Sequence, residues 1–231
     1  MPTHPHPLFE NIFWNDLTGS HAALAVGSSG ARRYAPGYSP IAAFADNERP
    51  DLDALALHCE VGEKLYCSGW RGDTPSGWNL LFEAPMIRMV WDTAMPDADA
   101  SFEAVPLDPR LHTPQVVELA ALTKPGPFGP RTIELGDFFG CFDADQRLIA
   151  MAGERTHAGL LREISGVCTH PEFQGRGLAR RLMLLLIRRE RERGELPFLH
   201  VVASNAVARG LYRRMGFRED AETNVRVISR R

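Results

Sequence analysis

Apolar residues follow helical spacing in some stretches of this chain and strand-like spacing in others. Residues 8–17 carry apolar side chains three and four positions apart, which predicts a helix. Residues 177–193 predict a longer amphipathic helix, with Leu178, Leu182, Leu185 and Leu186 on one face. Residues 138–142 and 147–154 predict a hairpin turned at residues 143–146. The mixture indicates an α/β (α+β) protein.

The second half of the chain predicts a regular order of elements. From residue 101 we expect β, α, loop, β, β, β, α, β, α, β. The expected strands lie near residues 101–107, 138–142, 147–154, 160–169, 197–203 and 224–228. The expected helices follow Asp108 and span residues 177–193 and 205–215. Prolines and glycines in residues 123–132 exclude a helix and predict a stiff loop there.

The first half predicts a separate lobe. Strands are expected at residues 21–26, 38–45, 64–67 and 80–91, and a short helix capped by Asp51 at residues 52–59. Small and acidic residues replace this pattern at residues 95–100. We therefore predict an amino-terminal lobe at residues 1–98 and a second domain at residues 99–231.

Composition limits the classes of partner. A net charge of −3 and a pI of about 6.2 argue against nucleic-acid binding. No apolar run approaches the roughly 20 residues of a membrane span. No metal-ligand spacing is present, so we predict no metal site. The four cysteines lack C-x-x-C spacing and predict reduced thiols in a cytoplasmic protein (Cys59, Cys67, Cys141 and Cys168).

A glycine-rich turn joins the strand expected at residues 160–169 to the helix that follows. Residues 174–179 read QGRGLA. The first N–H groups of a helix are unpaired and its macrodipole is positive at that end, so this turn can hold a phosphate. It is not a Walker loop, because no lysine follows, and the third Rossmann glycine is replaced by Arg180. A tight turn without a ligand is the alternative.

A second motif makes the turn more specific. Gln174, Gly177 and Ala179 give Q-x-x-G-x-A, and residues 204–217 contain N-x-x-A followed by L-Y-x-x-x-G-F. Together, over residues 138–217, these motifs resemble the GNAT superfamily of acyl-CoA-dependent N-acyltransferases. The resemblance implies a mixed, mostly antiparallel central sheet flanked by helices, with strands that splay at its centre. The first lobe would be a degenerate GNAT-like unit, similar to the glycine N-acyltransferase type.

The resemblance also implies a binding site for acetyl-CoA as cosubstrate. The backbone of Val167 and Thr169 would pair with the pantetheine arm, and an amide near Val167 or Cys168 would polarise the thioester carbonyl. The Asn205 side chain would hydrogen-bond the pantetheine. The pyrophosphate would lie on the turn, at Gln174, Gly175, Arg176, Gly177, Leu178 and Ala179.

Amine acylation needs a base and an acid. An ammonium group must lose a proton before it attacks, and a carboxylate can take that proton directly or through water. Glu163, at the start of the strand before the turn, is the first candidate, with Glu154 in reserve. Tyr212 is the candidate acid for the leaving thiolate, since it faces the same side of its helix as Asn205. His157, His170 and His200 are further candidates for the base, and His170 and His200 are interpreted as structural.

We therefore predict an N-acetyltransferase that moves an acetyl group from acetyl-CoA to a primary amine of a small molecule or amino acid. Attack is expected to be direct, in a ternary complex, because no cysteine stands in a nucleophile setting. The alternatives are a non-catalytic acyl-CoA sensor and a peptide or protein N-acetyltransferase. The protein is expected to be a monomer or homodimer.

Overall fold

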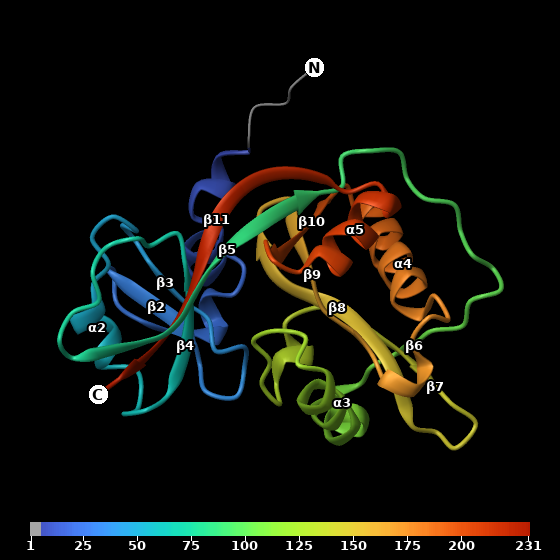
Figure 1. Cartoon of the computed structure of the whole chain (residues 1–231), viewed down its shortest axis with the longest axis horizontal. Helices are drawn as coiled ribbons and strands as arrows, with labels where there is room; N and C mark the ends of the chain where they lie inside the picture. Colours follow the sequence, from blue (N-terminus) through green and yellow to red (C-terminus); the bar gives the residue numbers. More distant parts are fainter. Residues whose placement is uncertain (1–5) are drawn as a thin grey trace.

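An eight-stranded sheet forms the centre of the computed structural model, which describes residues 6–231 (Figure 1). In spatial order its strands are β4 (Lys64–Ser68), β11 (Arg218–Arg230), β5 (Trp78–Val90), β10 (Leu196–Val202), β9 (Leu161–Thr169), β8 (Leu148–Ala158), β7 (Phe138–Phe142) and β6 (Val105–Pro106). Neighbouring strands are antiparallel except β9 and β10, which are parallel. The predicted mixed, mostly antiparallel sheet is confirmed.

Helices cover both faces of this sheet. On one face, α4 (Leu178–Glu192) and α5 (Ala206–Met215) share a core with Leu199 of β10. On the other face, α1 (Ile12–Thr18) shares a core with Phe198, and α3 (Pro109–Thr123) packs on β7 and β8. Adjacent strand residues point to opposite faces, which is why Phe198 and Leu199 belong to different cores.

The helix predicted at residues 177–193 is α4, although its buried stripe is not quite the expected one. Leu182 and Leu186 are fully buried as predicted, together with Met183 and Ile187. Leu178 and Leu185 are only partly buried. Asp51 and Asp108 cap α2 (Leu52–Ala56) and α3 by accepting hydrogen bonds from Ala54 N and Arg110 N.

A smaller, three-stranded sheet lies beside the large one and consists of β1 (Ala25–Gly27), β2 (Ala31–Tyr34) and β3 (Ala42–Phe44). Part of the strand predicted at residues 21–26 is a 3-10 turn, η2 (Ala22–Leu24), and β2 was not predicted. The hydrophobic pattern of β2 is interrupted by Arg32 and Arg33. Arg33 is nevertheless buried, because it forms an ion pair with Glu63. The remaining 3-10 turns are η1 (Pro7–Asn11), η3 (Thr132–Glu134) and η4 (Pro171–Phe173).

The large sheet draws strands from both sides of the boundary predicted at residues 98/99. Strands β4 and β5 precede that boundary, yet β5 lies between β11 and β10. The strands β4 and β5 of the amino-terminal half therefore belong to the same sheet as the strands that carry the predicted site.

Within residues 6–231, no helix combines the length and apolar character that crossing a bilayer requires. The same part of the chain holds no group of three or more His, Cys, Asp or Glu side chains arranged as a metal site.

Candidate active site

The strands β9 and β10 pair over only three residues, Leu161 to Glu163 with Leu196 to Phe198. Beyond Glu163 the two strands separate, and a cavity of about 420 Å³ opens between them. Gly166 lies in this stretch with φ +64°, beside a register shift against β8. A Cβ there would lie only 3.0 Å from Phe138 and 3.2 Å from Phe128, so both the positive φ and the close contacts favour glycine. The predicted splay of the central strands is therefore present.

The cavity takes its walls from both halves of the chain. Its floor is formed by residues 163–167 of β9 and 199–202 of β10, with residues 123–127 of the proline-rich loop on one side. Helix α5 contributes Ala208 and Tyr212, and the residue that caps it contributes Asn205. The amino-terminal half contributes mainly apolar and aromatic side chains, among them Phe13, Ile41, Tyr66, Cys67, Phe82 and Met86.

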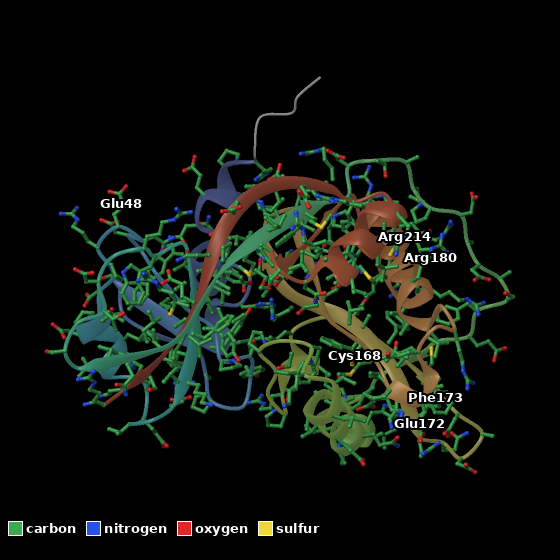
Figure 2. All side chains as sticks on the ribbon, in the orientation of Figure 1. Glu48, Cys168, Glu172, Phe173, Arg180 and Arg214 are labelled. Atoms are coloured by element: carbon green, nitrogen blue, oxygen red, sulfur yellow. The ribbon has the colours of Figure 1, made fainter. Side chains whose placement is uncertain are left out.

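The glycine-rich turn lies past the carboxyl end of β9, outside the cavity walls. Figure 2 shows Glu172 and Phe173 on the segment that leads into it. Gly175 and Gly177 have φ of +77° and +75°, and a Cβ on either would meet nothing within 4 Å. Helix α4 begins at Leu178 without a side-chain cap. Open space, unpaired helix amides and two glycines fit a pyrophosphate group.

Glu163 faces the cavity but its carboxylate is occupied. It is 0 % exposed and accepts hydrogen bonds from Arg155 Nε at 3.0 Å and Nη2 at 2.8 Å, and from the Thr156 hydroxyl. Burial would raise the pKa of Glu163, but the Arg155 guanidinium and the His200 hydrogen bond outweigh burial and hold that pKa well below its usual range. A base needs a pKa nearer the working pH, so this setting does not favour direct proton abstraction by Glu163.

His200 lines the cavity beside Glu163, which the sequence interpretation missed. Its Nδ1 lies 2.8 Å from Glu163 Oε1. Since a carboxylate only accepts, Nδ1 carries the proton, and the lone pair of the neutral ring is on Nε2. Nε2 has no hydrogen-bond partner in the described part of the chain and is not sealed from solvent. One signal was available: His200 is the polar residue in the otherwise apolar strand LPFLHVV.

Tyr212 of α5 and Asn205, the residue that caps this helix, both line the cavity, as the seven-residue spacing predicts. Burial raises the pKa of Tyr212, so its hydroxyl stays protonated at neutral pH. The Asn205 Oδ1 accepts from Ala208 N at 3.1 Å and caps α5, which leaves its amide NH₂ for a ligand.

The other predicted residues are placed less directly. Val167 lines the cavity, whereas Cys168 belongs to the core beneath α3 and Thr169 pairs with Ala150 of β8. Glu154 is buried outside the cavity walls, where its carboxylate is paired with Arg193 and Arg162. His157 and His170 also lie outside the cavity walls, and His170 caps η4.

Thiol chemistry has poor support at this site. Cys67 is the cysteine that lines the cavity, and burial raises its pKa to about 12. Burial raises the pKa of Cys168 to about 11. Because the thiolate is the nucleophile, both thiols are held in the unreactive form at neutral pH.

Comparisons with known proteins agree with this geometry. The family model of the FR47-like protein matches residues 139–227. A crystal structure from Novosphingobium aromaticivorans, described as an acetyltransferase from the GNAT family, is 36% identical, covers 98% of this chain and 99% of its own, and superimposes with a TM-score of 0.88. A search of curated proteins gives no match.

Two more distant structures share the fold. A GCN5-related N-acetyltransferase-like protein from Streptococcus suis is 17% identical, with a TM-score of 0.61 over 100% of this chain and 95% of its own. A GCN5-related N-acetyltransferase from Kribbella flavida is 14% identical, with a TM-score of 0.54 over 95% of this chain and 96% of its own.

Proposed function

Because this chain belongs to the GNAT family of N-acetyltransferases, we propose that it transfers the acetyl group of acetyl-CoA to a primary amine by direct attack in a ternary complex. One observation carries the proposal: β9 lines the cavity where it separates from β10, and the same strand then leads, beyond the cavity walls, to the uncapped amino terminus of α4. Acetyl-CoA supplies the activated acetyl thioester.

The binding roles follow the order of residues along β9 and α4. The amides of Gly175, Arg176, Gly177, Leu178 and Ala179, with Gln174, hold the pyrophosphate. The unpaired edge of β9 at Val167, the backbone near Cys168 and Thr169, and the amide of Asn205 hold the pantetheine arm. An N–H at Val167 or Cys168 polarises the thioester carbonyl.

The proton transfers use three side chains. His200 Nε2 takes a proton from the acceptor ammonium and passes it to water, and Glu163 positions the ring and stabilises its charged form. As the C–N bond forms and the C–S bond breaks, Tyr212 donates its proton to the sulfur. The second proton leaves the nitrogen for solvent, and Tyr212 is reprotonated from solvent. Glu163 therefore contributes to the base through His200, which departs from the role predicted from the sequence, where Glu163 itself takes the proton directly or through water.

The high thiol pKa values of Cys67 and Cys168 support transfer without an acyl-enzyme. All four cysteines are free, which supports the cytoplasm as the proposed location.

A matched pair of glycines tests the binding site. Gly177 and Gly194 lie at the two ends of α4, both with φ +75° and both with no atom within 4 Å of an added Cβ. The variants Gly177→Glu and Gly194→Glu therefore impose the same backbone strain, but only the first places a carboxylate in the phosphate turn. A ligand at 100 times its Kd adds about 2.7 kcal/mol to the native state.

Thermal unfolding is measured for both variants and the wild type with increasing acetyl-CoA. We expect Tm to rise in the wild type and in Gly194→Glu but not in Gly177→Glu. Release of CoA in the presence of amines then tests the chemistry. Binding without turnover of any amine would favour an acyl-CoA sensor, and no binding at all would remove the enzyme assignment.

A further inference from the structure

The charges on the cavity wall restrict the acceptor. The charged residues among those that line it are Lys124, Arg155 and Glu163, counting histidine as neutral. Glu163 is already paired with Arg155 at 2.8 Å, so the described wall offers no free carboxylate. An amine with several ammonium groups would have to leave water without a counter-charge, which is costly. The cavity is therefore unsuited to polyamines.

Arg155 instead offers a free donor for an anion. Its Nε and Nη2 both face Glu163, while Nη1 has no partner in the described structure and is not sealed from solvent. A guanidinium N–H is a strong donor to a carboxylate. Lys124, at the end of α3, is exposed and adds a second positive charge.

The free donor and the proposed base are held close together by one carboxylate. Glu163 Oε1 accepts from Arg155 Nη2 and from His200 Nδ1, each at 2.8 Å. A ligand that meets both residues needs an anionic group and an amine only a few bonds apart. An α-amino acid has this arrangement, with its carboxylate and amine on one carbon.

The remaining wall suits an apolar side chain. Phe13, Ile41, Tyr66 and Phe82 line it from the amino-terminal half, and the ring of Phe13 lies 5.4 Å from that of His200. Burying aromatic or aliphatic groups against such a wall is favourable at about 25 cal/mol per Å².

We infer that the acceptor is an α-amino acid with an apolar or aromatic side chain, its carboxylate on Arg155 Nη1 and its amine at His200 Nε2. This inference rests on the proposed acetyl transfer. It names a substrate class narrower than primary amines and excludes both polyamines and peptide amino termini.

Matched acceptors test it with the wild-type protein. L-phenylalanine and L-leucine are compared with L-phenylalaninamide and L-leucinamide, which keep the skeleton but replace the carboxylate with a neutral amide. Spermidine is the polycation. Initial rates of CoA release from acetyl-CoA give kcat/KM for each. We expect kcat/KM for each amino acid to be at least ten times that for its amide, even though the less basic amine of the amide is more often unprotonated. Spermidine should give no rate above background.

The outcomes separate this inference from the proposed function. Faster acetylation of the amides or of spermidine would overturn the acceptor class and leave acetyl transfer intact. Absence of transfer to every amine, with acetyl-CoA still bound, would overturn both.

The two lysines of the chain provide a second test. Lys124 lines the cavity, whereas Lys64 is exposed on β4 outside the cavity walls. Lys124→Ala should raise KM for L-phenylalanine several-fold more than it raises KM for L-phenylalaninamide. Lys64→Ala should alter neither. An equal effect of Lys124→Ala on the amino acid and on its amide would contradict recognition of the carboxylate.

Discussion

His200 and Glu163 meet across the split between β9 and β10, with Nδ1 of His200 2.8 Å from Oε1 of Glu163. The parallel pairing of Phe198 with Glu163 sets this contact, because it places His200 just where the strands begin to separate. The ring is thus fixed on one side by a buried carboxylate and left open to the cavity on the other. A buried carboxylate that orients an imidazole favours the protonated ring after proton transfer.

The first prediction concerns His200. His200→Gln removes the proposed proton acceptor, and we expect kcat to fall about 10²–10⁴-fold, the usual contribution of general base catalysis. The thermal shift with acetyl-CoA should be unchanged, because the phosphate turn is intact. His157→Gln is the control, since His157 lies outside the cavity walls.

A double-mutant cycle tests whether Glu163 acts through His200. If it does, adding Glu163→Gln to His200→Gln should lower kcat little further, because the effects of residues that act as a unit are not additive. Glu163→Gln leaves the buried Arg155 charged without its partner, which destabilises the fold. Near-UV circular dichroism therefore measures the folded fraction of each variant, and kcat is calculated for that fraction. Fully additive losses in log kcat would show that Glu163 acts independently of His200.

The second prediction concerns Tyr212. Tyr212→Phe removes only the hydroxyl, and loss of the proposed acid should lower kcat about 10²-fold while acetyl-CoA binding stays the same. The change is measured in steady-state kinetics beside Tyr38→Phe, which removes a phenol hydroxyl that bonds Arg131 away from the cavity. Wild-type turnover in Tyr212→Phe would mean that water protonates the sulfur.

The third prediction concerns Glu190 on α4. Its side chain is 0 % exposed and neither carboxylate oxygen has a partner in the described structure. Burial and the nearby Glu154 carboxylate raise the pKa of Glu190 well above its usual range. The folded state thus holds this proton more tightly than the unfolded state, so stability is lost as pH rises through the folded-state pKa.

Glu190→Gln should therefore raise the free energy of unfolding at pH 7 by about 1 kcal/mol or more. Each kcal/mol should raise Tm by roughly 2–4 °C. The gain should disappear below about pH 4, where the carboxyl group is protonated in both states. Glu192→Gln, on the exposed side of the same helix, should stay within about 0.5 kcal/mol of the wild type. A gain of equal size at both pH values would contradict the explanation.

The fourth prediction concerns the boundary at residues 98/99. A fragment of residues 99–231 loses β4 and β5, so β11 has no strand partner and β10 keeps only its short pairing with β9. We expect this fragment to show no cooperative thermal transition by circular dichroism, in contrast to the full chain. A fragment that melts cooperatively and binds acetyl-CoA would support the domain division predicted from the sequence.

Elements with a clear apolar period were predicted from the sequence, and those stabilised by buried ion pairs were not. The periodicity located α4, α5, β9 and β10 to within a few residues. β11 extends well beyond its predicted residues 224–228, because charged side chains in the added part are paired across strands, as Asp220 is with Arg88 of β5. Charge pairing of this kind hides a strand from any reading based on hydrophobicity.

The candidate site was predicted in part for a related reason. Short motifs predicted the glycine-rich turn before α4 and placed Asn205 and Tyr212 on one side of α5, where both line the cavity, because these features depend on local spacing. The pairing of Glu163 with His200 joins residues 37 positions apart and depends on the register of two parallel strands. The sequence alone does not specify that register, so Glu163 was identified without its partner.

The short pairing of β9 with β10 has a thermodynamic consequence for the native state. Past Glu163, both strands present backbone amides and carbonyls to the cavity instead of to each other, so this sheet remains incomplete along one seam. Buried peptide groups need partners, and a ligand that brings its own amides can occupy the place of the missing strand pairing. Amide hydrogen exchange along residues 164–169 and 199–202 should then slow on binding and recover on release, so that each turnover completes and reopens the sheet.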